Sequence, residues 1–202
     1  MAWYDMLAQQ WASQSIWEVI AVLLAIAYVW LAARQSIWCW PCALISTGIY
    51  SWLFWEHTLP LQTLLNLYYL GMAVYGWLNW RRIEDQTLNG LKEYNWTFHL
   101  PVIAGLLLIG WALAAGLSDF FISDYLYLDA LVTVFSLFTT YLVTQKVLEN
   151  WLYWIVINAL AAWLYWHSGL YLTGLLFVSY VAFAAYGYLK WRGEYIAQPD
   201  AS

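Results

Sequence analysis

Two stretches of this sequence determine the fold, and they are copies of one another. Residues 40–81 read WPCALISTGIYSWLFWEHTLPLQTLLNLYYLGMAVYGWLNWR, and residues 151–192 read WLYWIVINALAAWLYWHSGLYLTGLLFVSYVAFAAYGYLKWR. A constant offset of 111 residues aligns them without a gap, and it extends to 17–82 against 128–193, with 16 identities at 66 positions. The identities include Trp40 with Trp151, Tyr69 with Tyr180, and Gly76 with Gly187. In a membrane protein such a repeat is typical of two structural halves around a shared site.

The amino-acid composition is that of a membrane protein. Of the 202 residues, 64% are apolar and 9% are charged, whereas soluble domains carry about 25% charged residues. Long apolar runs between short polar breaks indicate an all-α, polytopic membrane protein that forms one transmembrane domain over residues 1–202. The net charge of −5 argues against nucleic acid as a partner and leaves membrane lipid as the surroundings.

Seven transmembrane helices are predicted, since each crossing needs about 20 mainly apolar residues. The spans are 17–34, 38–55, 61–80, 97–116, 125–144, 149–166 and 170–191. Residues 17–82 then form a first three-helix repeat, 96–117 a linker helix, and 125–193 a second three-helix repeat. The polar stretch 81–95 is the one loop long enough to be a linker.

The basic residues predict how the chain is oriented. With seven spans, the loops after spans one, three and five lie on the same side as the C-terminus. All seven Lys and Arg belong to that side, namely Arg34, Arg81, Arg82, Lys92, Lys146, Lys190 and Arg192. The positive-inside rule therefore places the C-terminus in the cytoplasm and the N-terminus outside. Spans one and five point the same way, which makes the repeat parallel, with a site near mid-bilayer between the halves.

Polar side chains inside the spans are the candidates for this site, because lipid makes them costly. Span five carries Asp129, Thr133, Ser136 and Thr140 on one helical face. These residues indicate a hydrated path. For the hydroxyls, packing between membrane helices is an equally good interpretation.

Spans two, three and six add amides and aromatic rings. Asn158 falls near the middle of span six with Trp154 one turn earlier, and its counterpart in the first repeat is Thr47. An amide framed by aromatic rings suits a flat polar ligand, although a structural Asn bonded across helices is the alternative. The remaining candidates from these spans and from span seven are Ser46, Tyr50, Gln62, Asn66, Tyr69 and Tyr180.

Two further pairs of repeat-related residues complete the predicted site. Trp52 and Trp163 lie deeper than the interfacial Trp residues, and aromatic faces attract organic cations. Glu18 and Asp129 fall near the outer ends of their spans and are predicted to form an acidic outer mouth that concentrates a cation. The alternative for this pair is stabilisation of helix N-termini by carboxylates.

Several other chemistries do not fit the sequence. Cys39 and Cys42 have redox spacing but start an apolar helix, and the three His do not bracket the membrane core. No phosphate-binding glycine loop is present, and the polar clusters lack the mid-membrane titratable group that an intramembrane enzyme needs. We therefore expect no metal, no cofactor and no enzymatic activity; a structural membrane subunit without transport is the other alternative.

The motifs resemble those of the PnuC family of bacterial vitamin transporters. The resemblance rests on Glu149-Asn150-Trp151 leading to Trp154 and Asn158, and on Tyr75-Gly76-Trp77 with Trp80, and it covers about 17–193. It implies a 3+1+3 arrangement like that of the SWEET sugar carriers, a trimer, and an inner-membrane location. It also implies uptake of nicotinamide riboside by facilitated diffusion, with trapping by phosphorylation in the cytoplasm. Ser46 and Asn66 stand where the family has Asn and Gln, and thiamine, another flat cation, is the alternative substrate.

Overall fold

The computed structural model describes residues 3–56, 60–86, 90–120 and 125–197, and over these residues the prediction of an all-α fold is confirmed. The helices are α1 (Trp3–Ala12), α2 (Ile16–Ala33), α3 (Cys39–Glu56), α4 (Pro60–Gln86), α5 (Trp96–Leu117), α6 (Leu126–Thr144), α7 (Asn150–His167) and α8 (Tyr171–Ile196). In the described part, extended pairing is limited to one isolated bridge between Lys92 and Val147.

Four of the described helices, α2, α5, α6 and α8, are long and apolar enough to cross a membrane. The other long helices, α3, α4 and α7, are richer in Trp, Tyr and polar residues, so their apolar area comes from rings that carry polar groups. Helix α4 also continues to Gln86 and α8 to Ile196, past the predicted span ends at 80 and 191. Both extensions carry charged residues, which is expected of helix ends that leave the apolar layer.

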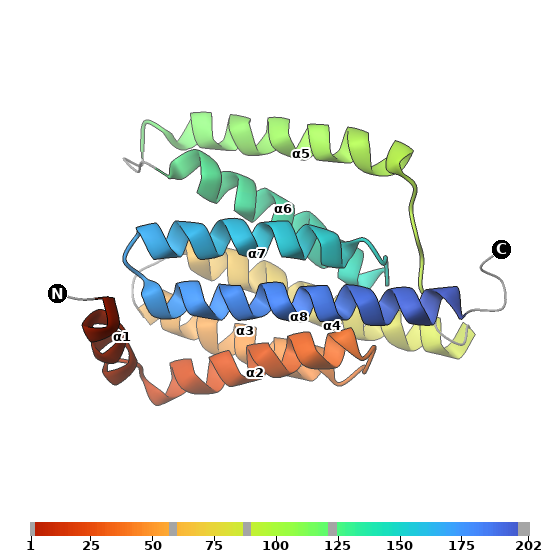
Figure 1. The fold of residues 1–202 in the computed structure, drawn as a ribbon, viewed down its shortest axis with the longest axis horizontal. Coiled ribbons are helices and arrows are strands. Elements are labelled where there is room, and N and C mark those ends of the chain that lie inside the picture. The colour runs from red at the N-terminus through yellow and green to blue at the C-terminus, as the bar shows by residue number, and fades with distance from the viewer. Residues whose placement is uncertain (1–2, 57–59, 87–89, 121–124, 198–202) are drawn as a thin grey trace.

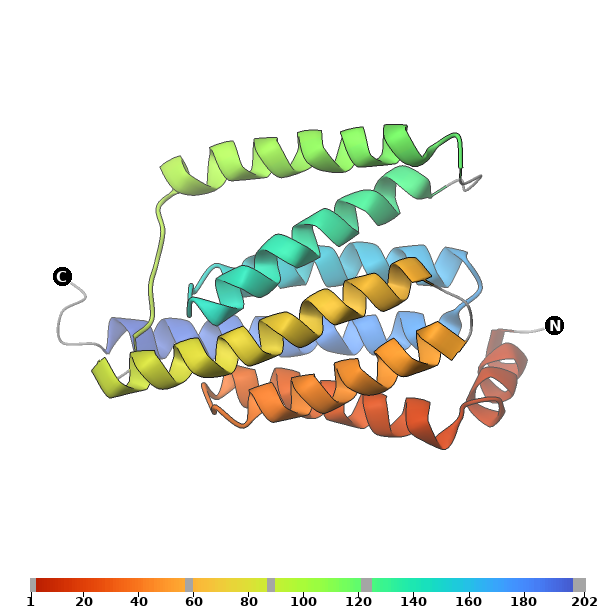
Figure 2. The same cartoon turned by 180° about the vertical axis from the view of Figure 1, so that it is seen from behind.

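Six of the helices form a closed ring, and α5 lies outside it. Within each half, the middle helix packs against its two neighbours, α3 against α2 and α4, and α7 against α6 and α8. Between the halves, α2 packs against α8 and α4 packs against α6. Figures 1 and 2 show this arrangement from opposite sides, with α5 along one edge, where it packs mainly against α6.

The two ends of the bundle differ in charge and in how they are tied together. Helices α2, α4, α6 and α8 end where the C-terminus lies (Figure 1), and the Lys and Arg residues fall within about two turns of these helix ends or in the adjoining loops. At the opposite end, α1 is attached to the second half through Gln10. The Gln10 amide donates to the Gly169 carbonyl at 2.8 Å and accepts from the Leu172 N–H at 3.0 Å.

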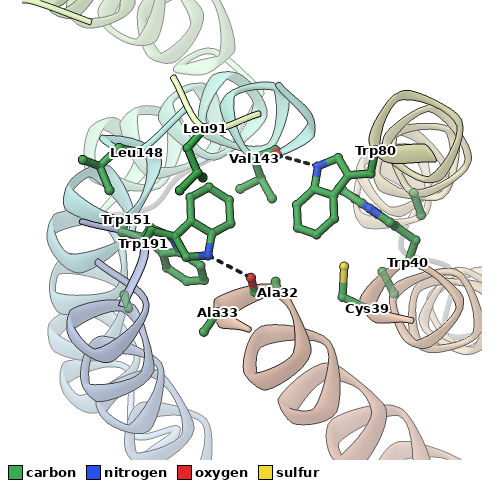
Figure 3. Packing of buried hydrophobic residues seen from close by; sticks show 13 residues of the cluster. Ala32, Ala33, Cys39, Trp40, Trp80, Leu91, Val143, Leu148, Trp151 and Trp191 are labelled. Atoms are coloured by element: carbon green, nitrogen blue, oxygen red, sulfur yellow. Dashed lines mark hydrogen bonds between the residues drawn. The ribbon is translucent and has the colours of Figure 1, made fainter. Parts of the chain in front are cut away.

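Four buried Trp residues join the two halves at the C-terminal end of the bundle (Figure 3). The indole N–H of Trp80 donates to the Val143 carbonyl at 3.1 Å, and the indole N–H of Trp191 donates to the Ala32 carbonyl at 3.1 Å. Trp80 and Trp191 are 111 residues apart, and so are their acceptors. Each half therefore donates one hydrogen bond to the equivalent position of the other half.

The turns before the middle helices also match at this offset. Gln35 and Lys146 both adopt left-handed backbone conformations, with φ of 54° and 55°, which are uncommon for residues other than glycine. The ammonium of Lys146 is buried, stands 4.8 Å from the centre of the Trp80 ring, and lies 3.9 Å from a Glu84 carboxylate oxygen. Burial lowers the pKa of Lys146, and Glu84 acts in the opposite direction.

Candidate binding cavity

A cavity of about 340 Å³ lies inside the ring and is lined by all six of its helices. Nine pairs of lining residues are related by the offset of 111, so the two halves contribute equivalent positions. The pairs are Ala25/Ser136, Val29/Thr140, Ala32/Val143, Trp40/Trp151, Ala43/Trp154, Ser46/Ile157, Thr47/Asn158, Tyr69/Tyr180 and Ala73/Ala184. The cavity therefore lies between the halves.

Most of the predicted site residues meet in this cavity. They come from both halves and from five helices, and they are Ser46, Thr47, Tyr69, Asp129, Thr133, Ser136, Trp154, Asn158 and Tyr180. The same face of α6 adds Thr140, the last residue of the predicted polar stripe.

Asn158 has the properties of a ligand-binding side chain. It is 6% exposed and lines the cavity, yet its amide makes no hydrogen bond to the residues that the structure describes. A structural Asn would be bonded to a neighbouring helix, because a buried amide without a partner costs free energy. Asn158 can therefore bond a molecule that enters the cavity.

The hydroxyl groups divide between structural and lining roles. Ser46 donates to the Ala21 carbonyl of α2 at 2.8 Å, so it joins two helices. Thr47 and Thr140 donate within their own helices, to the carbonyls of Ala43 at 2.7 Å and Ser136 at 2.8 Å. These donors are occupied, but each hydroxyl oxygen can still accept a hydrogen bond from a ligand.

Five other predicted residues are not brought to the cavity wall. Trp52 and Trp163 are 46% and 48% exposed on the outer surface, where they contact Trp17 and Tyr125. The reason is helical geometry, since each Trp follows its cavity-lining neighbour, Thr47 or Asn158, by five residues, about 140° around a helix. The other three are Tyr50, which stacks on Phe54 instead, the buried Asn66 and the half-buried Glu18. The side chain of Gln62 lies outside the described residues.

The structure adds aromatic residues that the predicted site left out. Trp40 and Trp151 line the cavity from the C-terminal end of the bundle. Both indole nitrogens are buried, and neither has a hydrogen-bond partner among the described residues. Their identity across the repeat was a signal for their importance. Tyr28, Tyr165 and Phe177 complete the aromatic lining. Of these, Tyr28 lies on α2 beside Ala25 and Val29, which are the counterparts of Ser136 and Thr140 on the polar face of α6.

The charge of the cavity wall is acidic. Asp129, in the first turn of α6, is the one charged residue among those that line the cavity. Its counterpart, Glu18, instead forms a capping box with Ser15 at the start of α2, with the Ser15 hydroxyl 3.2 Å from the Glu18 N–H. No group of three His, Cys, Asp or Glu residues in the described ranges could hold a metal ion.

Comparisons with known proteins agree with this geometry. The family model for the nicotinamide mononucleotide transporter matches residues 15–193. The riboflavin/roseoflavin transporter RibM of Streptomyces davaonensis is 24% identical over 182 residues, covering 87% of this chain and 84% of that protein. The nicotinamide riboside transporter PnuC of Escherichia coli is 22% identical over 200 residues, covering 86% of this chain and 84% of that protein.

One solved structure shares the fold. The crystal structure of the vitamin B3 transporter PnuC superposes with a TM-score of 0.70 at 21% sequence identity, covering 95% of this chain and 87% of that chain. The chain belongs to the nicotinamide mononucleotide transporter family, whose members are membrane transporters and not enzymes.

Proposed function

We propose that this protein transports a flat cationic vitamin, nicotinamide riboside, through the cavity inside the ring. The observation that carries the proposal is the lining itself, which combines the unbonded Asn158 amide with aromatic rings and a single carboxylate, Asp129. Nicotinamide riboside has a positively charged ring, an amide and a ribose. Each of these three groups has a complementary partner in the lining.

The parts of the substrate can be assigned to walls of the cavity. Trp154, Tyr69 and Tyr180 offer ring faces that attract a pyridinium cation. Asn158 and Ser136 offer hydrogen bonds to the amide and the ribose hydroxyls. The outer mouth is reduced to Asp129, because Glu18 is engaged in the capping box.

The related proteins support this substrate class. Escherichia coli PnuC is named for nicotinamide riboside and Streptomyces RibM for riboflavin, and both molecules join a flat heteroaromatic ring to a chain of hydroxyl groups. Asp129 favours the cationic compound of the two. Thiamine, which is also a flat cation with an alcohol tail, is the second candidate for the same reason.

The membrane arrangement belongs to the same proposal. We infer seven crossings by α2 to α8, with the basic end of the bundle in the cytoplasm and the N-terminus outside. The halves α2–α4 and α6–α8 form a parallel repeat like that of the SWEET carriers, and the linker helix α5 connects them. Rocking of one half against the other would open the cavity to each side in turn.

The energetics of uptake follow from the same reasoning. We propose facilitated diffusion across the bacterial inner membrane, with phosphorylation in the cytoplasm trapping the product, and a trimer as the assembled form. Uptake would then need no ion gradient. In vesicles without a kinase, the substrate would reach equal concentrations on both sides.

The test measures binding of nicotinamide riboside, thiamine and riboflavin to the purified protein by calorimetry, with uptake into vesicles. Replacing Asn158 with Leu should lower affinity for the substrate about 30-fold or more, since about 2–3 kcal/mol is lost when a buried hydrogen-bonding group is removed. Thr47→Val, at the equivalent position, is the matched control and should change affinity less than about threefold. Unchanged binding by the Asn158 variant would refute the placement of the site.

A further inference from the structure

A second cavity, of about 710 Å³, lies outside the ring between α5 and α7. Helix α5 packs against α6. Its contact with α7 is made near the start of both helices, where His99 lies against Tyr153. The space between the two helices is floored by α6 and reaches the C-terminal end of the bundle, where the end of α8 and the loop before α5 contribute residues. Val132 and Ile157 line both cavities, so they form a common wall.

The long part of this cavity is apolar and has the dimensions of one acyl chain. Its walls include Ile103 and Leu107 of α5, Phe135 of α6, and Val156 and Leu160 of α7. The residues lining it on the α7 side run from 149 to 160, a rise of about 16 Å at 1.5 Å per residue. Half of the hydrocarbon core of a bilayer is about 15 Å thick, so a chain from one leaflet fits this length.

The polar end of the cavity holds two buried side-chain atoms that make no hydrogen bond to the part of the chain that the structure describes. The Glu149 carboxylate accepts the Tyr94 N–H at 3.1 Å through Oε1, while Oε2 is unpaired. His99 is 4% exposed, its Nδ1 lies 3.0 Å from the Tyr153 hydroxyl, and its Nε2 is also unpaired. These two unpaired atoms lie 3.8 Å apart, too far for a direct hydrogen bond. A polar group placed between them would satisfy both.

The charge around this polar end selects the kind of headgroup. Glu93 and Glu149 both line it, and no Lys or Arg is among the lining residues. Five aromatic rings surround the carboxylates, from Tyr94, Trp96, Tyr153, Tyr188 and Tyr195. Carboxylates with aromatic faces attract an ammonium group and repel an anionic one.

We propose that this cavity binds a membrane lipid with a primary ammonium headgroup, a phosphatidylethanolamine of the leaflet at the basic end. One acyl chain lies between α5 and α7, and the ammonium group donates to Glu149 at the polar end. The bound lipid fills the space that α5 leaves beside the ring and forms part of the packing behind the common wall with the transport cavity. This site is separate from the transported substrate, so it does not depend on which vitamin is carried.

The test is native mass spectrometry of the full chain, purified in detergent and mixed with equal concentrations of dioleoyl phosphatidylethanolamine and dioleoyl phosphatidylglycerol. The ethanolamine lipid should be retained at least tenfold more than the glycerol lipid. Leu107→Trp should reduce its retention about tenfold by filling the groove. Leu108→Trp is the matched control, because Leu108 is 68% exposed beside the groove and should leave retention unchanged.

Two further variants separate headgroup recognition from packing. Glu149→Gln keeps an acceptor for the Tyr94 N–H and should remove the preference for the ethanolamine lipid, with acyl-chain binding intact. Val156→Phe fills the groove from the opposite wall and repeats the test should Leu107→Trp fail to fold. Equal retention of the two lipids, or equal effects of the Leu107 and Leu108 variants, would overturn the proposal. So would a change of oligomeric mass in Leu107→Trp alone, because that result would identify a second copy of the chain as the occupant.

Discussion

The two halves of the ring share their internal packing. In the first half Trp40 and Trp80 meet edge to face with ring centres 5.3 Å apart, and in the second half Trp151 and Trp191 do so at 5.4 Å. A glycine of the third helix lies against the first ring of each pair, Gly76 against Trp40 and Gly187 against Trp151. The repeat therefore preserves the contacts that hold each half together.

The walls that the halves present to the cavity are different. On α6 the lining includes Thr133, Ser136 and Thr140, where the equivalent positions of α2 are Val22, Ala25 and Val29. On the middle helices, Trp154 and Asn158 face Ala43 and Thr47. At these positions the larger hydrogen-bonding groups and the Trp ring belong to the second half, and the smaller side chains belong to the first. The two walls of the cavity therefore differ, although the packing around them is nearly symmetric.

The largest expected effect comes from substitutions that disrupt the packing that the two halves share. A Cβ atom at Gly76 would fall within 3.0 Å of the Trp40 ring, and one at Gly187 within 3.0 Å of the Trp151 ring. Both rings are buried, so each would have to shift within the packed cluster to make room. Gly76→Ala and Gly187→Ala should each destabilise the protein by about 1–3 kcal/mol, the usual cost of overpacking. Thermal unfolding in detergent, followed by size-exclusion chromatography, measures the loss.

A third glycine provides the control for this experiment. Gly71 lies on the same helix as Gly76, is exposed, and has no atom within 4 Å of an added Cβ. Gly71→Ala should leave stability unchanged or raise it by up to about 1 kcal/mol, because Ala favours the helix over Gly. If Gly76→Ala were as stable as Gly71→Ala, the repeated Trp–Gly contact would not be what holds each half together.

The second prediction tests whether equivalent carboxylates of the two halves differ in their effect on ligand binding. Asp129 and Glu18 occupy equivalent positions, but Asp129 lines the cavity and Glu18 caps a helix. Asp129→Asn should weaken binding of nicotinamide riboside about tenfold, or about 1.4 kcal/mol, because the cation loses its carboxylate. Glu18→Gln should leave binding unchanged, since Gln also serves in a capping box.

An uncharged ligand tests whether charge is the cause. Riboflavin binding by Asp129→Asn should match that of the unaltered protein if the substitution acts through charge alone. Calorimetry with both ligands separates the outcomes. Equal losses for the two carboxylate variants would contradict the assignment of Asp129 to the cavity wall.

The sequence predicted the helical elements well because their apolar runs are long and their breaks are polar. It also predicted that positions 111 residues apart would meet around a common space, as Thr47 and Asn158 do. Its errors concern direction around a helix. Trp52 and Trp163 seemed suitable because of their depth in the spans, yet depth says nothing about which side of a helix a ring occupies, and both rings lie on the outer surface.

Other features depend on contacts that no local pattern encodes. Ser46 looked like a ligand contact, but its hydroxyl bonds the Ala21 carbonyl of a neighbouring helix. The buried His99 and the half-buried Glu149 line a groove that lies between α5 and α7 and is floored by α6. Relations of this kind come from how helices pack, and the periodicity of one helix does not reveal its neighbours.

The smallest expected effect concerns the hydrogen bonds that cross between the halves. Trp80→Phe and Trp191→Phe each keep a ring in the cluster but remove one indole N–H, and they leave the carbonyls of Val143 and Ala32 without that donor. Each variant should lose about 0.5–1.5 kcal/mol of stability, the net value of one hydrogen bond. Because the two bonds are equally long and equivalent in the repeat, the losses should agree within about 0.5 kcal/mol.

Trp55→Phe controls for loss of an indole group as such, because Trp55 is 69% exposed and should tolerate the change.

The double variant of Trp80 and Trp191 tests whether the two hydrogen bonds between the halves depend on each other. Both rings belong to the same buried cluster, with centres 6.1 Å apart, so their effects should not simply add. If the two hydrogen bonds close the C-terminal end of the cavity cooperatively, the first substitution should weaken the remaining hydrogen bond. The double variant should then lose less stability than the sum of the two single variants. Strictly additive losses of stability would show that the two hydrogen bonds are independent contacts. A large difference between the two single variants would show that the equivalent hydrogen bonds of the two halves contribute unequally to stability.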